Sequence, residues 1–152
     1  MTERMLLWQD SASTENIIAG IDGVSLTNLS EPQTGCLHDF QMTPADMKLL
    51  STADVFVNPT REDTFPTVNI EALACGTPVV TFQTGGSPEC IDEVCGIVVP
   101  CDDIEQLKQA ILSVCEGNLL CEDACLKRAN TFKTTVMLNQ YIDTYRKDTF
   151  RR

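Results

Sequence analysis

Short apolar runs alternate with amphipathic segments through the middle of the chain. The runs "ADVFV" (53–57), "TPVVTF" (77–82) and "GIVVP" (96–100) are each bounded by asparagine, glycine or proline. Mostly apolar runs of this length are typical of strands that are buried on both faces of a sheet. The pattern therefore predicts three buried strands.

The segments around these strands carry helix signals. Thr43 is placed to cap a helix whose first residue is Pro44, and Asp103 with Gln106 forms a capping-box pattern. The second of these helices has a predicted apolar stripe, which consists of Ile104, Leu107, Ile111, Leu112 and Cys115. Further helices are predicted in "TVNIEALACG", in "EDACLKRANTF", in "VMLNQYIDTYRKD" and, after a glycine turn, in "GGSPECIDEVCG".

Strands that alternate with helices predict an α/β fold, a Rossmann-like parallel sheet with flanking helices. The helical and strand signals divide the chain into an atypical segment (1–42), a Rossmann-like half-domain with C-terminal helices (43–147) and a tail (148–152). In the first segment only "VSLTN" suggests a strand, near Val24 to Thr27. Ligands of such sheets bind beyond the carboxyl ends of the strands, so the loops that follow the three runs are the candidate site.

Composition narrows the class of ligand. The 152 residues are 43% hydrophobic and 22% charged, which is typical of one globular domain, and the net charge is -11. This charge argues against binding to nucleic acid or to anionic lipid through a basic surface. A phosphate would have to be held locally, by helix ends or by a few placed cations.

Eight cysteines raise the question of disulfides or metal. No C-x-x-C pair occurs, and the closest spacings, Cys90/Cys95 and Cys121/Cys125, fit neither zinc nor redox motifs. The chain has no run of signal-peptide or membrane-spanning length. We expect reduced structural cysteines, a cytoplasmic location and no transmembrane segment.

Two stretches carry candidate chemistry. Glu71 lies in an apolar helical run, where it either occupies the exposed face or accepts both hydroxyls of a ribose diol. In "GGSPE" (85–89), Ser87 is placed to cap a helix, and glycines with a helix start favour an anion. The simpler interpretation of Glu89 is an acid that complements the dipole of that helix.

The combination resembles the C-terminal, nucleotide-sugar-binding domain of the family 4 retaining glycosyltransferases of GT-B architecture. The matching features are the "PT" turn after the first run, the "EDTFP" loop, "EALACGTPVV" and "GGSPE", in this order. The resemblance extends from about Thr43 to Tyr145. It implies that the chain is a partial C-terminal domain, a donor domain in transfer of a sugar from a nucleoside diphosphate sugar to an acceptor hydroxyl, with retention.

The resemblance also implies site residues. Glu71 matches the second of the two family glutamates and would bind the donor ribose, while the first falls on Asp63 or is displaced onto Glu62. Phe65, Pro66 and Thr67 would lie along the donor. Gly85, Gly86 and Ser87 would face the sugar and the diphosphate, and Glu89 would organise the turn. No metal or other cofactor is expected, because GT-B enzymes stabilise the leaving group with helix ends and cations.

Parts of the family pattern are missing. The acceptor domain and the diphosphate-binding Arg/Lys pair are not found, since the only basic residues before Pro59 are Arg4 and Lys48. We therefore expect the isolated chain to be inactive in transfer. The alternative function is a non-catalytic module that binds a nucleotide sugar or a partner. A third alternative, an ordinary nucleotide-binding oxidoreductase, would need a G-x-G-x-x-G turn after a strand, and the sequence contains no such turn.

The predicted partners follow from the sheet. If the strand order is 3-2-1-4-5-6, the three runs are strands 4, 5 and 6, and "VSLTN" takes the place of strand 3. The free edge of strand 4 would then need cover. That cover would come from the N-terminal 40 residues, from a missing N-terminal half or from another copy. Besides these, the only expected partner is the nucleotide sugar, and a full-length relative would lie peripherally at the inner membrane face.

Overall fold

The computed structural model describes residues 4–8, 24–28, 43–117 and 121–149. Along the chain, the elements are β1 (Arg4–Trp8), β2 (Val24–Asn28), α2 (Pro44–Thr52), β3 (Val55–Asn58), α3 (Thr67–Ala74), β4 (Val79–Phe82), α4 (Ser87–Cys90), β5 (Gly96–Val99), α5 (Ile104–Cys115), α6 (Glu122–Asn130) and α7 (Thr134–Thr149). The α/β class is confirmed, and strands form at all three predicted runs. β3 and β4 are buried throughout, but the prediction that the third strand is buried as well is wrong in part, because β5 lies at the edge of the sheet and Val98 is 37% exposed.

The five strands form one parallel sheet in the order β2-β1-β3-β4-β5. Of the three predicted sources of cover for the β3 edge, the N-terminal residues are confirmed, because β1 pairs with β3 in parallel register, with Leu6 opposite Val55. The "VSLTN" strand is confirmed and is the outer neighbour of β1. The N-terminal residues therefore complete the sheet with regular strands.

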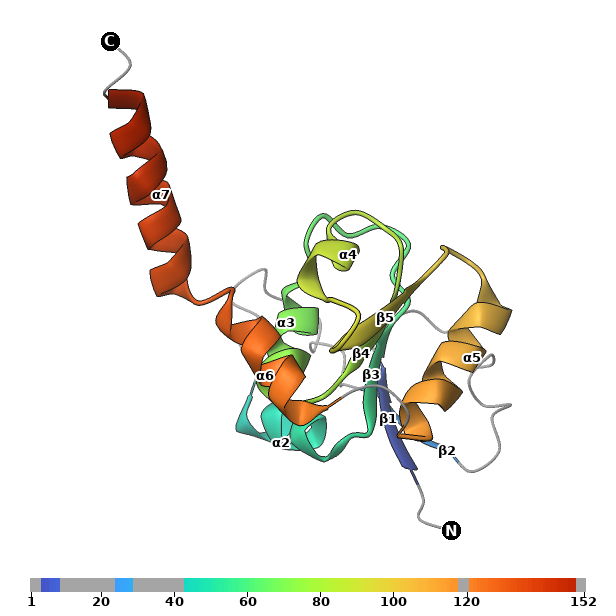
Figure 1. The fold of residues 1–152 in the computed structure, drawn as a ribbon. Coiled ribbons are helices and arrows are strands. Elements are labelled where there is room, and N and C mark those ends of the chain that lie inside the picture. Colours follow the sequence, from blue (N-terminus) through green and yellow to red (C-terminus); the bar gives the residue numbers. More distant parts are fainter. Residues whose placement is uncertain (1–3, 9–23, 29–42, 118–120, 150–152) are drawn as a thin grey trace, which may run out of the picture.

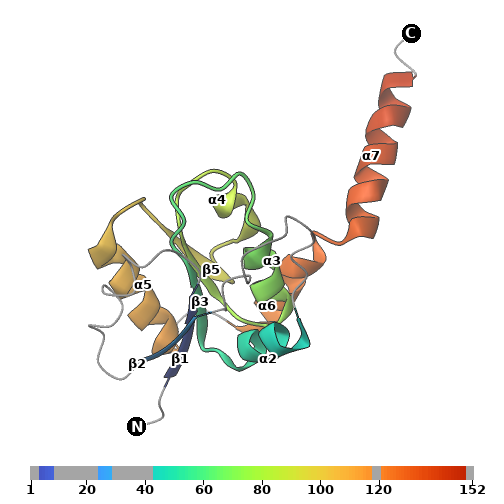
Figure 2. The same cartoon turned by 180° about the vertical axis from the view of Figure 1, so that it is seen from behind.

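Helices cover both faces of the sheet, because side chains alternate along each strand. Val55, Val57, Val80 and Phe82 face α5 on one side of the sheet, while Phe56 and Val79 face α2, α3 and α6 on the other. Figures 1 and 2 show α5 alone on its side and the other helices opposite. The result is a three-layer arrangement with a core on each face of the sheet.

Two of the predicted helix caps form, whereas one predicted cap and one residue of the predicted apolar stripe differ in the structure. The capping box at Thr43 and the Asp103 cap are both formed. Leu112, however, is 40% exposed and does not belong to the buried stripe of α5. Ser87 is not a cap either: Gly86 holds the N-cap position of α4, without a side-chain cap bond.

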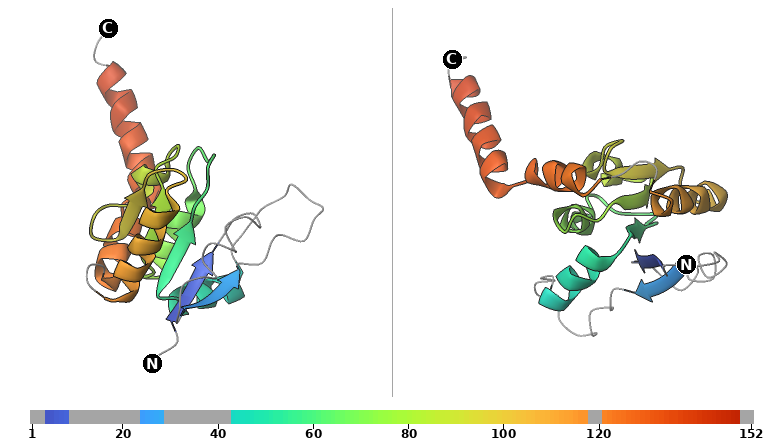
Figure 3. Two further views of the ribbon diagram at one scale, coloured as in Figure 1. Left: turned by 90° about the vertical axis from the view of Figure 1, so that its right-hand side faces the viewer. Right: turned by 60° about the horizontal axis from the view of Figure 1, so that its bottom comes forward.

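The last helix, α7, extends away from the body of the molecule in every view (Figures 1 and 3). It carries a stripe of exposed large apolar side chains, namely Met137, Leu138, Tyr141, Ile142 and Tyr145. No helix in the described part of the chain is both long and apolar enough to cross a membrane.

The seven cysteines in the described part of the chain form no disulfide with one another, and Cys36 lies outside the described residues. Burial raises the pKa of Cys90 and Cys125 to about 11 and that of Cys95 to about 12. A thiol with such a pKa stays protonated at neutral pH and behaves as a small apolar side chain. These cysteines serve the packing of the core that α3 and α6 share.

Candidate functional site

The loops after β3 and β4 lie side by side at the carboxyl end of the sheet (Figures 1 and 2). The Thr84 Oγ1 hydroxyl donates to the Thr60 carbonyl at 2.9 Å. A Cβ on Gly85 would overlap the Asp63 carbonyl oxygen, and one on Gly86 would overlap that of Thr64. Both glycines are therefore required by the close packing of the two loops, which the sequence did not reveal.

The two acids of the first loop have different surroundings. Asp63 is half-buried, and its Oδ1 accepts a hydrogen bond from the Phe65 amide at 3.0 Å, so its carboxylate shapes its own loop. Glu62 is exposed, and its carbonyl accepts a hydrogen bond from the Thr60 hydroxyl at 3.3 Å. Asp63 is thus the acid built into the loop, while the side chain of Glu62 faces solvent.

Glu71 lies in the second turn of α3, behind this loop. The residue is half-buried, yet its Oε2 is fully buried and has no hydrogen-bond partner among the described residues. Burial raises the pKa of the Glu71 carboxyl above its ordinary value, because the charged form loses water. An acceptor oxygen without a donor is costly to bury, so Glu71 is not an ordinary surface residue.

The start of α3 is tied to the end of β3 by a buried amide pair. Asn58 Nδ2 donates to Asn69 Oδ1 at 2.9 Å, and the Asn58 carbonyl accepts from Thr81 Oγ1 at 2.7 Å. Asn69 Nδ2 has no partner in the described part of the chain. Sequence reasoning missed this pair, although an asparagine inside the apolar run of α3 was a usable signal.

No side chain of the described residues caps the start of α3. The helix begins at Thr67, directly after Pro66, with no side-chain cap. The first amides of a helix have no acceptor within the helix, and they favour negative charge. Pro66 itself is buried, while Thr67 is exposed.

The "GGSPE" turn leads into α4, which is a single turn. Ser87 is fully buried, and its Oγ has no hydrogen-bond partner among the described residues. Glu89 has an exposed side chain, and its backbone carbonyl is held by another helix. This turn is therefore shaped by packing, and its serine is directed inward.

Arg128 of α6 is the residue that holds α4, and no sequence signal marked it. Its guanidinium donates from Nη2 to the Glu89 carbonyl at 2.6 Å and from Nε to the Cys90 carbonyl at 3.2 Å. It also lies over the Phe132 ring, 4.9 Å from the centroid. Phe132 in turn makes an edge contact with Phe65, with centroids 6.1 Å apart. Arg128 thus links α4 to the loop that contains Asp63.

Replacing Arg128 with lysine is expected to destabilise the protein by about 1–2 kcal/mol. A lysine keeps the charge but cannot offer two fixed donors to two carbonyls while its charged group also lies over the Phe132 ring. Urea unfolding measures the change. The matched control is Lys127→Ala, at an exposed neighbour, which should shift stability by less than about 0.5 kcal/mol. Equal stability of Arg128→Lys and the wild type would contradict the assigned role.

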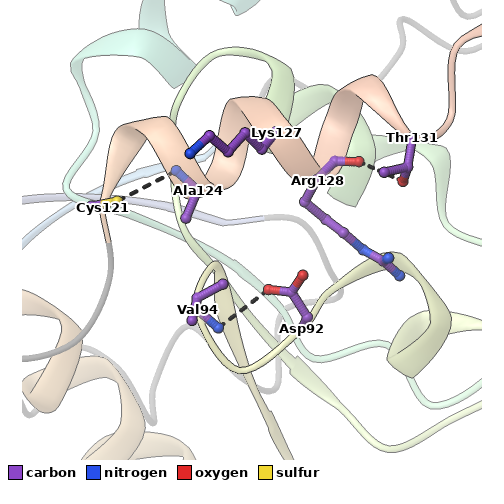
Figure 4. Close-up of a pocket in the computed structure, with 7 residues that line it drawn as sticks. All are labelled: Asp92, Val94, Cys121, Ala124, Lys127, Arg128 and Thr131. Carbon is purple, nitrogen blue, oxygen red and sulfur yellow. Dashed lines mark hydrogen bonds between the residues drawn. The ribbon is translucent and has the colours of Figure 1, made fainter.

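A hollow of about 480 Å³ lies elsewhere on the surface (Figure 4). It lies between α6 and the turn before β5, and its lining consists of Asp92, Val94, Cys121, Ala124, Lys127, Arg128 and Thr131. This is the amino end of β5, opposite to the end where parallel sheets bind ligands. None of the residues predicted for the site lines this hollow. The described residues also contain no group of three or more His, Cys, Asp or Glu side chains placed to hold a metal ion.

Relatives of the chain are known by name. It is 35% identical over 98 residues to a D-inositol 3-phosphate glycosyltransferase of Saccharomonospora viridis, with 62% of this chain and 23% of that protein covered. It is 33% identical over 111 residues to an alpha-maltose-1-phosphate synthase of Mycobacterium tuberculosis, with 66% and 29% covered. The chain thus spans less than a third of the length of these relatives.

Solved structures agree on the fold. The sucrose-phosphate synthase of Thermosynechococcus elongatus superposes with a TM-score of 0.66 at 21% identity, covering 99% of this chain and 47% of that one. The structure of TarM superposes with a TM-score of 0.56 at 13% identity, covering 94% and 35%. Each likeness covers less than half of the neighbouring chain. Residues 8–117 match the family described as glycosyl transferases group 1, and the chain belongs to that family.

Proposed function

We propose that this chain binds a nucleoside diphosphate sugar at the carboxyl ends of β3 and β4, as the donor domain of a family 4 retaining glycosyltransferase. The observation that carries the proposal is Glu71 Oε2, a buried carboxylate oxygen without a donor among the described residues. A ribose has two adjacent hydroxyls, each of which can donate to one carboxylate oxygen. Binding would supply the donors that the folded chain lacks.

The surrounding residues support this placement. The amides at the start of α3, at Thr67, are suited to the negative charge of a diphosphate or to sugar oxygens. Asp63 or, less directly, Glu62 would contact the transferred sugar, with Phe65 and Pro66 alongside the donor. In this proposal Gly85 and Gly86 allow the close packing that holds the Asp63 loop in place. Ser87 is buried beneath this loop, and the carbonyl of Glu89 accepts a hydrogen bond from Arg128.

The proposed chemistry is departure of a nucleoside diphosphate from an oxocarbenium-like carbon. Preorganised donors stabilise the charge that develops on the leaving group. No metal is assigned a role, and the acceptor half of the site would come from outside these 152 residues. We expect this to take place in the cytoplasm. An assay for glycosyl transfer by the purified chain should detect no product, and transfer would overturn the assignment of only a donor half.

The direct test is calorimetric titration with uridine and guanosine diphosphate sugars. We expect saturable binding of at least one of them, with the free diphosphate competing for the same site. Binding of a nucleoside diphosphate sugar that is insensitive to substitution of Glu71 would move the site elsewhere. Absence of binding to every nucleotide sugar would overturn the proposed function.

One observation favours the alternative of a non-catalytic binding module. The Asp63 carboxylate already accepts the Phe65 amide, and this aspartate is one methylene shorter than the family glutamate. A carboxylate that shapes its own loop is less available to a transferred sugar. The module would then bind the nucleotide portion of the donor with equal affinity whichever sugar is attached, which the same titrations measure.

A further inference from the structure

Arg61 connects two loops that follow non-adjacent strands of the sheet, β3 and β5. It lies in the loop after β3, and its Nε is 2.6 Å from Oδ1 of Asp102, in the turn after β5. Because β4 lies between β3 and β5, the ion pair spans the carboxyl end of β4. The pair therefore crosses the same end of the sheet as the proposed donor site.

The charge of this end of the sheet makes Arg61 distinctive. In the described loops after β3, β4 and β5, Arg61 is the only basic residue, against four acids: Glu62, Asp63, Asp102 and Asp103. The whole chain carries a net charge of -11. A nucleoside diphosphate brings further negative charge, which would be repelled unless a cation offsets it.

Arg61 can leave Asp102 for another anionic partner at little cost in free energy. The two side chains of this ion pair are 52% and 57% exposed, and exposed pairs of this kind contribute little net stability because water screens them. The backbone on either side of Arg61 is held independently, by the Thr84–Thr60 hydrogen bond and by the packing of Gly85 on Asp63. The guanidinium can thus change its partner while the loop stays in place.

We propose that Arg61 is the cation that pairs with the diphosphate of the donor, and that Asp102 holds this side chain in the free protein and competes for it. The inference rests on the proposed function and assigns the phosphate contact within that site. An arginine fork fits two phosphate oxygens at once, as it fits a carboxylate. Ligand binding replaces one anionic partner of Arg61 with another.

The test uses two substitutions with opposite expected signs. Arg61→Ala should weaken binding of uridine or guanosine diphosphate about 10-fold or more, since a hydrogen bond to a charged group is lost. Asp102→Asn should strengthen it by up to about 5-fold, since the competing charge is removed. Neither change should alter binding of the corresponding nucleoside without phosphate. The matched control is the α5 pair Glu105 and Lys108, whose Glu105→Gln and Lys108→Ala variants should bind as the wild type does.

The outcomes of this test distinguish the role of Arg61 from the proposed function, which is binding of the nucleoside diphosphate sugar. Weaker binding in both Arg61→Ala and Asp102→Asn would mean that the ion pair only holds the two loops together, and would overturn the inference. Unchanged binding in Arg61→Ala, with normal binding by the wild type, would overturn it as well and leave the proposed function standing. A wild type that binds no nucleotide would overturn both.

Discussion

Gly85→Ala is expected to destabilise the protein by about 3 kcal/mol, the largest effect that we predict for a one-carbon change. Gly85 has φ +46, a backbone conformation that costs an L-residue about 1–2 kcal/mol. Its added Cβ would also overlap the Asp63 carbonyl oxygen, so the backbone of one loop must move. Such overpacking typically costs a further 1–3 kcal/mol.

Gly117→Ala is the matched control, because it separates these two causes. Gly117 also has a positive φ, of 77, but no atom of the described residues lies within 4 Å of an added Cβ. Its substitution should cost only the conformational penalty, about 1 kcal/mol. Urea unfolding of both variants gives the comparison. Equal losses of stability would mean that the loops of β3 and β4 do not depend on this contact.

Glu71→Gln is expected to weaken nucleotide-sugar binding about 30-fold while making the protein more stable at neutral pH. The amide keeps the size of the side chain and one acceptor oxygen, but it loses the charge that strengthens both ribose hydrogen bonds, at a cost of about 2 kcal/mol of binding energy. In the free protein the same substitution removes a buried charge that lacks a partner among the described residues. Binding is measured by calorimetry and stability by urea unfolding.

The stability gain of Glu71→Gln should depend on pH. Burial raises the pKa of the Glu71 carboxyl above its ordinary value of 4.5, so the folded wild type binds this proton more tightly than the unfolded chain does. The penalty of the charged form is therefore fully present above the folded pKa, and it disappears as the pH falls toward 4.5. The gain should be present at pH 7 and should disappear as the pH falls toward 4.5.

An exposed carboxylate provides the control for that experiment. Glu105→Gln, on the outer surface of α5, should change neither nucleotide binding nor the pH dependence of unfolding beyond about 0.5 kcal/mol. If Glu71→Gln instead lowers stability at pH 7, its Oε2 must have a donor in the folded protein. A ribose would then not be needed to supply hydrogen-bond donors to Glu71, and its placement there would be wrong.

Much of the fold could be predicted from local pattern. The strands β3 and β4 are buried along continuous apolar runs, β5 follows a third such run, and the caps at Thr43 and Asp103 form within three residues of the helix start. β1 was not predicted, because "RMLLW" is too short to show a period. The strand is assigned only through its pairing with two distant segments, β2 and β3.

The candidate site divides in the same way. Glu71, Asp63 and the "GGSPE" turn could be named from residue types and spacing, since the chemistry of a carboxylate or a glycine belongs to the residue itself. Arg128 could not, because its role exists only where α6 meets the carbonyls of α4, 38 and 39 residues away along the chain. Arg61 and Asp102 likewise meet across 41 residues.

The residues that carry the chemistry, and the class of sheet that holds them, thus follow from local patterns in the sequence, because helix periodicity, caps and buried runs depend on near neighbours. Tertiary structure alone decides that the glycines serve the packing of two loops, that the oxygen of Glu71 is buried without a donor in the described chain, and that one arginine spans the end of β4. Burial and pairing depend on which distant segments the fold brings together, and no local pattern records that.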